Sequence, residues 1–426
     1  IGALEKGQEI HVEIERRGFL ERDCMVGNTL LDMYAKCGSL VMAQEVFNEL
    51  LVQDVVSWNA LIGGYAEHGY ALDVLQGFEE MQLQGVCPNA VTFIHSLKAC
   101  STIDDVEKAE EIHFEIERRG LLERELIGNT LVSMYAKCGL LSKSQQVFET
   151  LQVRDVVSWT SLIAGYAEHV DGERALTCFE QMQVEGVTPN AVALICALKA
   201  CSNLGAPEKG QTIHAEIERQ GLLESDIVVG NSLVDMYARC GLFAIAQEVF
   251  DKIPVRDVIS WNALITGYAE HGHIDDVLKC FDQMHVHGIS PNAATFVSIT
   301  KACCSIGSTN KMAEIHAEIE RLGLLEKCNV VGSSLVYMYS KSGNLTKAEH
   351  VFHKLPIQDR VSWTILMGGY AQLGNFENML LIFERMLGED IKPDPVAFLV
   401  VLDTCTRAGL VDKGYSYFEA MSKDYG

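Results

Sequence analysis

Hydrophobic positions along the chain recur at steps of three and four residues, which is the spacing of one face of an α-helix. The apolar runs are short, and glycine stands between them, where helices commonly end. One stretch holds two such runs: Leu61, Ile62, Tyr65 and Gly69, then Leu75, Phe78, Met81 and Gly85, with Pro88 beyond. No segment alternates with a period of two for long enough to propose a strand. The pattern therefore predicts an all-α chain of paired short helices.

The same pattern returns about every hundred residues, and this period decides the architecture. The string VGNTLLDMYAKCG at Val26 recurs with few changes from Ile127, Val229 and Val331. Two other recurring strings subdivide the period. They are VVSWNALIGGYAEHG, from Val55, Val156, Val258 and Arg360, and VTFIHSLKAC, from Val91, Val192, Ala294 and Val396. Each period therefore holds three helical pairs.

A single pair of short helices cannot bury its apolar face alone, whereas stacked neighbours bury it continuously. We therefore expect a right-handed α-solenoid of helix–turn–helix repeats of tetratricopeptide-like form. No interior linker or low-complexity tract interrupts the pattern, so we expect one array over residues 1–426 and no second domain.

Composition and charge narrow the classes of function. With 48% hydrophobic and 22% charged residues, the chain can bury a large core and is not disordered. Its 34 Lys and Arg against 58 Asp and Glu give a net charge of −24, which argues against a polyanionic partner. No apolar run reaches the ~18 residues of a membrane span. Ile1 is not an initiator methionine followed by a leader, so we expect a fragment whose targeting segment is missing.

The three strings resemble pentatricopeptide repeats of the plant class in which P, L and S motifs alternate, and the resemblance covers essentially the whole chain. Each P motif has 35 residues, each complete L motif 35 or 36 and each S motif 31, a mixed spacing that an array of equal tetratricopeptide repeats would not show. The expected motifs are a partial L at 1–23, then S 24–54, P 55–89, L 90–124, S 125–155, P 156–190, L 191–226, S 227–257, P 258–292, L 293–328, S 329–359, P 360–394 and a partial L at 395–426.

The resemblance implies that the fifth and last residues of each P or S motif read one base of single-stranded RNA, as helical repeats are known to do. An Asn amide offers a donor and an acceptor that match a pyrimidine edge, whereas a Thr or Ser hydroxyl leaves room for a purine. The implied base-reading pairs are Asn28 with Asp54, Asn59 with Asn89, Asn129 with Asp155, Thr160 with Asn190, Asn231 with Asp257, Asn262 with Asn292, Ser333 with Asp359 and Thr364 with Asp394.

The family's pairing rules imply the site U, C/U, n, U, A, n, U, C/U, n, G, G, read 5′ to 3′, with each L motif left undetermined as n. The fifth residues of the L motifs cannot hydrogen-bond a base, because they are Ile94, Ile195, Val297 and Leu399. We interpret these residues as packing or spacing elements.

The resemblance also assigns two further roles. The second residue of each motif sandwiches the base, which implies Met25, Val56, Leu126, Val157, Val228, Ile259, Val330 and Val361. An aliphatic residue near a helix start more often belongs to the core. The thirteenth residue of each S motif contacts phosphate, which implies Lys36, Lys137, Arg239 and Lys341. The P motifs carry Glu67, Glu168, Glu270 and Gln372 there, so we expect modest affinity and a shallow salt dependence.

Other conspicuous residues have plainer interpretations. Trp58, Trp159, Trp261 and Trp363 share one helical phase and are expected in the core. Cys100, Cys201, Cys303 and Cys405 also share a phase, without a CxxC pair or a His cluster at zinc spacing, so we expect free thiols, no metal and no cofactor. His11, His113, His214 and His316 are expected as surface or inter-repeat contacts. No phosphate loop or catalytic motif is present in the sequence.

Two functions remain open. The first is sequence-specific binding of single-stranded RNA, an organellar transcript, as the recognition part of a C-to-U editing factor in a mitochondrion or chloroplast, with other editing factors as further partners. No small-molecule substrate or membrane is expected, and any deaminase would lie in a C-terminal domain beyond Gly426. The second is a protein–protein scaffold of tetratricopeptide type, which would have no need for the paired polar residues.

Overall fold

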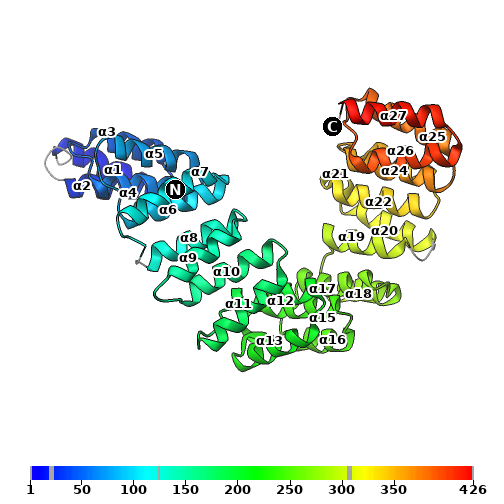
Figure 1. Ribbon diagram of the computed structural model, residues 1–426, viewed down its shortest axis with the longest axis horizontal. Coiled ribbons are helices and arrows are strands. Elements are labelled where there is room, and N and C mark those ends of the chain that lie inside the picture. Colours follow the sequence, from blue (N-terminus) through cyan, green and yellow to red (C-terminus); the bar gives the residue numbers. More distant parts are fainter. Residues whose placement is uncertain (1, 19–23, 123–124, 305–308, 425–426) are drawn as a thin grey trace. The chain divides into compact units, whose positions relative to one another are not determined.

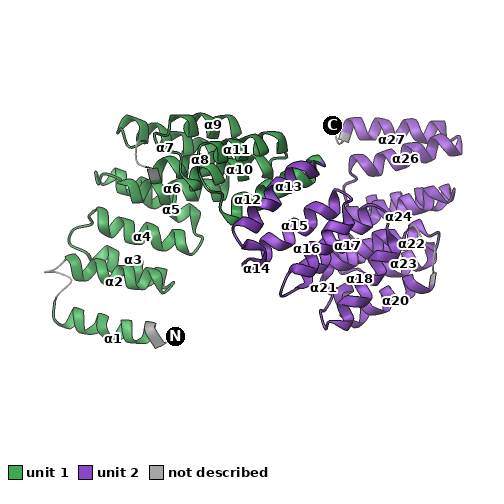
Figure 2. Cartoon of the chain, turned by 90° about the horizontal axis from the view of Figure 1, so that it is seen from below, with its two compact units in different colours: residues 1–204 green, residues 205–426 purple. Residues whose placement is uncertain are grey.

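The computed structural model describes residues 2–18, 24–122, 125–304 and 309–424, and within these ranges it contains helices and no strands (Figure 1). The all-α prediction is confirmed. Among the described helices, none has the length and apolar character needed to cross a membrane. The chain divides into two compact units, residues 1–204 and 205–426 (Figure 2).

Twelve helices are described in the first unit. They are α1 (Gly2–Arg16), α2 (Cys24–Lys36), α3 (Leu40–Glu49), α4 (Val55–Glu67), α5 (Ala71–Leu83), α6 (Ala90–Ile103), α7 (Val106–Arg118), α8 (Glu125–Lys137), α9 (Leu141–Thr150), α10 (Val156–Glu168), α11 (Gly172–Val184) and α12 (Ala191–Leu204).

The second unit repeats the arrangement, with two added single-turn helices. Its helices are α13 (Pro207–Arg219), α14 (Leu222–Ser225), α15 (Ile227–Arg239), α16 (Phe243–Lys252), α17 (Val258–Glu270), α18 (Ile274–Val286), α19 (Ala293–Cys303), α20 (Thr309–Arg321), α21 (Leu324–Lys327), α22 (Asn329–Lys341), α23 (Leu345–Lys354), α24 (Arg360–Gln372), α25 (Phe376–Gly388), α26 (Pro395–Ala408) and α27 (Val411–Asp424).

The first helices of successive pairs form a continuous layer in each unit. In the first unit α2 contacts α4, α4 contacts α6, and the series continues through α8, α10 and α12. In the second unit α15, α17, α19, α22, α24 and α26 follow one another in the same way. These helices begin at the residues where the motifs were expected to begin, from Cys24 to Pro395. The assignment of each pair to a P, L or S type stays a prediction.

Glycine permits close approach within this layer. A Cβ on Gly64 of α4 would lie 2.6 Å from the Cβ of Ala35 on α2, and Gly165 stands in the same relation to Ala136. Glycine also ends helices as expected, because Gly69 and Gly85 adopt φ values of 81° and 76°, which are strained for other residues.

The tryptophans lie in the core, as predicted. Their side chains are 1–2% exposed, and each packs edge-on against a phenylalanine of the preceding helix at 4.5–4.8 Å between ring centroids. The pairs are Phe47 with Trp58, Phe148 with Trp159, Phe250 with Trp261 and Phe352 with Trp363. Such pairs contribute about 0.5–1.5 kcal/mol beyond their buried area, so they join each S-type hairpin to the next first helix.

Candidate nucleic-acid interface

The last residue of each expected P or S motif caps the first helix of the next motif. Asp54 accepts hydrogen bonds from the backbone N–H groups of Val56 and Ser57 at 2.9 Å, and Asp155 accepts one from Ser158 at 2.8 Å. An Asp or Asn at this position stabilises a helix start by about 1 kcal/mol. That these residues cap helices was not predicted from the sequence, although Asp or Asn directly before an apolar helical run is the usual signal of an N-cap.

Six of the eight predicted pairs are joined by a side-chain hydrogen bond from the fifth residue to the last. The donor–acceptor distances are 3.4 Å for Asn28–Asp54, 3.0 Å for Asn59–Asn89, 2.9 Å for Asn129–Asp155, 3.2 Å for Thr160–Asn190, 3.3 Å for Asn231–Asp257 and 3.1 Å for Asn262–Asn292. Two side chains 26 or 30 residues apart therefore present their polar atoms together.

The other two pairs have different partners. Asp359 accepts a hydrogen bond from the Asn329 side chain at 2.6 Å, and Ser333 is not bonded to it among the described contacts. The Thr364 hydroxyl donates to the backbone carbonyl of Arg360 at 2.8 Å, while Asp394 caps α26. Neither pair has a direct hydrogen bond among the described residues, although Thr364 and Asp394 line one cavity.

The fifth residue is buried in three of the expected S motifs and in one expected P motif, where it is Thr364. Asn129, Asn231 and Ser333 are each 6% exposed. The Oδ1 atoms of Asn28, Asn129 and Asn231, and the Ser333 hydroxyl, are buried without a hydrogen-bond partner in the described structure. Leaving a buried polar atom unpaired costs roughly 1–3 kcal/mol. A ligand that hydrogen-bonded these atoms would recover that cost.

The P-type asparagines have partners for both polar atoms. Asn59 Oδ1 accepts a hydrogen bond from the Thr92 hydroxyl at 2.6 Å, and Asn262 Oδ1 accepts one from Thr295 at 2.7 Å. Thr92 and Thr295 lie in the following expected L motifs, where they also complete capping boxes with Asn89 and Asn292. The L motifs thus support the neighbouring pair even though their own fifth residues are apolar.

The eight second-position apolar residues are exposed, so the alternative that they belong to the core does not hold, and their contact with a base stays a prediction. Their exposed fractions lie between 52% for Val157 and 74% for Met25. Val91, Val192 and Val396 hold the same position in the L motifs and are also about half exposed, a set that sequence reasoning missed. A repeated row of exposed aliphatic side chains beside the capped helix starts is a feature of a binding face.

One cavity in the second unit collects all three kinds of predicted residue. Its volume is about 370 Å³, within the range of roughly 300–1,000 Å³ that small-molecule sites occupy. Its lining includes Lys341 from α22, Val361 and Thr364 from α24, and Asp394 and Val396 at the start of α26. The cavity therefore brings a hydroxyl, a carboxylate and an ammonium group together with two aliphatic side chains.

The four predicted phosphate-contacting cations are not equally available. Lys36 pairs with Asp32 at 2.7 Å, which raises the pKa of the lysine, and Arg239 lies 3.0 Å from Asp235 and 3.8 Å from Glu270. Lys341 donates to Gln372 at 3.0 Å. Lys137 is exposed and forms no ion pair within the described residues. In two of the four cases, the residue at this place in the following expected P motif, Glu270 or Gln372, contacts the cation of the preceding motif.

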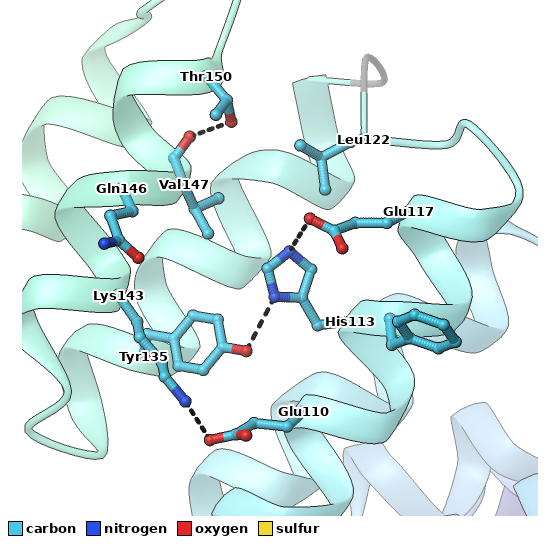
Figure 3. A pocket seen from close by; sticks show the side chains of 10 residues that line it. Glu110, His113, Glu117, Leu122, Tyr135, Lys143, Gln146, Val147 and Thr150 are labelled. Atoms are coloured by element: carbon cyan, nitrogen blue, oxygen red, sulfur yellow. Dashed lines mark hydrogen bonds and ion pairs between the residues drawn. The ribbon is translucent and has the colours of Figure 1, made fainter.

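The repeated histidines are inter-repeat contacts, as predicted, but they do not lie on the surface. His113 Nδ1 lies 2.9 Å from the Tyr135 hydroxyl, and Figure 3 shows its ring between Tyr135 and Glu117. Burial lowers the pKa of His113, His214 and His316. Cys100, Cys201, Cys303 and Cys405 are buried, and burial raises the pKa of Cys100 to about 12, so it is a poor thiolate ligand.

Repeat-family models match most of the chain. The model described as the PPR repeat family matches residues 53–102, 154–203 and 256–305, and the model described as the PPR repeat matches residues 28–55, 129–156, 231–258, 333–356, 361–391 and 396–425. Together they cover more than half of the sequence. The chain belongs to the pentatricopeptide repeat family.

Relatives in the pentatricopeptide repeat family come from Arabidopsis thaliana. A protein named as chloroplastic is 35% identical over 99% of this chain and 52% of its own length, and one named as mitochondrial is 31% identical over 99% of this chain and 61% of its own length. A third is 33% identical over 99% of this chain and 60% of its own length. The chain therefore spans between about half and three fifths of these relatives.

Solved structures show the same pentatricopeptide repeat fold. The crystal structure of the pentatricopeptide repeat protein PPR10 in complex with an 18-nt psaJ RNA element matches with a TM-score of 0.73 and 19% identity. The match covers 94% of this chain and 61% of PPR10. This likeness confirms the α-solenoid predicted from the repeat period.

Proposed function

We propose that this pentatricopeptide repeat chain binds single-stranded RNA along the first helices of both units, with one base read by each P or S motif. The supporting observation is the repeated combination of an exposed apolar residue with a polar pair at the start of the next helix. Reading one unpaired base per helical repeat suits this spacing. The solved relative PPR10 holds an RNA element, which supports the proposal by analogy.

Helix capping by itself can explain an Asp or Asn at the last position of a motif. Asp or Asn at a helix start is favoured in any helical array, including a protein–protein scaffold. The exposed second residues have no such explanation, because they neither cap a helix nor fill the core. They favour RNA over the scaffold of tetratricopeptide type.

The finer part of the proposal concerns the biological setting. We place the chain in the class with alternating P, L and S motifs, acting on an organellar transcript as the recognition part of a C-to-U editing factor, with other editing factors as partners. The mitochondrial and chloroplastic names of the relatives support an organelle. The deaminase step would belong to another domain or protein, since the repeats offer hydrogen bonds and no catalytic group.

The decisive experiment is a gel-shift titration with an RNA that carries U, C/U, n, U, A, n, U, C/U, n, G, G. The parent chain is compared with Thr160→Asn, which replaces by an amide the hydroxyl that is predicted to read the fifth base. We expect the preference at the fifth base to move from A to C or U, because the amide matches a pyrimidine edge. An Ile94→Val variant, altered at an L-motif fifth position, should leave every preference unchanged.

Each other outcome has a defined meaning. An unchanged preference in Thr160→Asn would overturn the base assignment. Absence of RNA binding by the parent chain would overturn the proposed function and favour the scaffold.

A further inference from the structure

Four equivalent junctions each hold a histidine between a tyrosine and a glutamate. The histidines are His11, His113, His214 and His316, and in each the Nδ1 atom lies 2.9–3.1 Å from a tyrosine hydroxyl of the following first helix. The Nε2 atom lies 3.4–3.6 Å from the glutamate four residues later. Figure 3 shows the second copy, with His113, Tyr135 and Glu117.

The last residue of the neighbouring S-type second helix distinguishes the four copies. In the third and fourth copies it is a lysine: Lys252 lies 3.4 Å from Glu218, and Lys354 lies 2.8 Å from Glu320. In the second copy it is Thr150, which lines the same pocket as His113. In the first copy it is Glu49, so a carboxylate stands where two sister junctions place an ammonium group.

The first junction therefore brings two carboxylates to one imidazole. Ligand atoms of His11, Glu15 and Glu49 all lie within 4.8 Å of one another. His11 is 7% exposed, and its Nε2 atom is buried without a hydrogen-bond partner. Among the described residues, no lysine or arginine forms an ion pair with Glu15 or Glu49, since the adjacent Arg16 and Arg17 bond to Glu13.

We propose that His11 Nε2, Glu15 and Glu49 bind one divalent transition-metal ion of the zinc class. An imidazole with two carboxylates is a donor set that Zn²⁺, Co²⁺ and Ni²⁺ accept, whereas Mg²⁺ and Ca²⁺ prefer oxygen alone. The two carboxylates balance the charge of the ion, which takes the place of the lysine ammonium of the sister junctions. Solvent supplies the remaining ligand, because both glutamates are exposed.

The tyrosine completes the site. With the metal on Nε2, the Nδ1–H of His11 donates to the Tyr34 hydroxyl at 3.1 Å, which holds the ring in the ligating tautomer. His11 and Glu15 lie on α1 and Glu49 lies on α3, so the ion would link two helices that share few other contacts. None of the three ligands is a predicted RNA-contacting residue, and the inference does not depend on RNA binding.

The test is calorimetric titration of the 426-residue chain, carrying no histidine tag, with Zn²⁺. We expect one saturable equivalent in the parent chain and its loss in His11→Gln and in Glu49→Lys. The second variant reproduces the lysine of the sister junctions, so it is compatible with the fold. Glu5→Lys makes the same change of charge on α1, about two turns before His11, and should keep the equivalent.

A Co²⁺ spectrum identifies the ligands, because the chain also contains exposed cysteines. We expect d–d bands of a nitrogen and oxygen site without thiolate charge-transfer absorption. Undiminished Zn²⁺ binding by Glu49→Lys, thiolate absorption as the only Co²⁺ signal, or no saturable binding by the parent would each overturn the proposal.

Discussion

At the scale of single residues, the aspartates and asparagines at motif ends serve two purposes at once. Each caps the first helix of the next motif, and in six of the eight pairs it accepts a hydrogen bond from the fifth residue of its own motif. Burial alone would raise the pKa of Asp257, but hydrogen bonds from Ser260, Asn231 and the Ile259 N–H lower it, so the carboxylate stays charged. The proposed specificity and local stability are therefore linked through one side chain.

Substitutions at Asp155 separate the two purposes. Asp155→Ala removes the cap of α10 and should weaken this helix start by about 1 kcal/mol. Asp155→Asn keeps a capping oxygen and should leave stability nearly unchanged while relaxing the preference at the fourth base from U towards C. Amide hydrogen exchange in the first turn of α10 measures the first effect, and equal exchange in both variants would contradict it.

Sequence reasoning reached these pairs through family resemblance, because residues 26 or 30 apart leave no local signal of contact. It could not decide whether Val56 and its equivalents are buried. Helical periodicity gives the spacing of an apolar face, whereas exposure depends on which neighbour covers that face.

At the scale of helices, the stacking of first helices depends on glycine. Gly368 and Gly369 are adjacent in α24, and they differ in surroundings. A Cβ at Gly369 would lie 2.6 Å from the Cβ of Ser340, whereas one at Gly368 would meet nothing within 4 Å.

This pair gives a matched prediction about stability. Gly369→Ala should destabilise the chain by about 1–3 kcal/mol, because overpacking forces α22 and α24 apart. Gly368→Ala should be neutral or stabilising by up to about 1 kcal/mol, since alanine is the better helix former. Urea denaturation compares the stability of the two variants. Equal effects would show that the close contact at Gly369 does not require glycine.

The buried histidines make the junctions sensitive to pH. Because burial lowers the pKa of His113, His214 and His316, the unfolded chain binds more protons below about pH 6.5, and stability falls as the pH falls. The facing groups at the second junction are Glu117, Glu110 and Lys143. We expect stability to decline from pH 7 to pH 5. In a variant with all three of these histidines replaced by Gln, the dependence of stability on pH should be weaker. An unchanged slope in thermal melts across that range would contradict this origin.

Helix identity was predictable from the sequence because the three-to-four spacing and the glycine breaks act locally. The histidine–tyrosine contacts were not, because the partners lie 22 or 23 residues apart and both residue types are common on surfaces.

At the scale of the whole molecule, the acidic charge is spread unevenly. In α7, Glu115 is engaged by Arg118 and Arg119, so part of the carboxylate charge is neutralised within the second-helix layer. The first helices carry few cations, and two of the four predicted phosphate contacts are paired with carboxylates.

This distribution predicts a weak dependence of RNA binding on salt. Single-stranded binding loses about 0.7 in log–log slope for each phosphate contact, so four cations allow a slope of at most about −3. Titration of binding against KCl measures it, and Glu168→Lys, which adds a cation at the thirteenth residue of an expected P motif, should steepen the slope. A slope near that of a basic groove in the parent chain would contradict the assigned contacts.

The solenoid itself was predictable from the repeat period, since stacking is the only way for such short hairpins to bury their apolar faces. The division into compact units at residues 204 and 205 has no counterpart in the repeat pattern. This division depends on the three-dimensional contacts of many residues, and the repeat period of the sequence carries no information about them.

The helix caps have a consequence for how such a protein can evolve. Asp and Asn at the last position of a motif both cap the next helix. Exchanging one for the other therefore changes the proposed target base without lowering the stability of the fold. New binding sites would be reached through intermediates that all fold, one repeat at a time. The same property offers a route to redesigned arrays in which target choice and stability are adjusted at different positions.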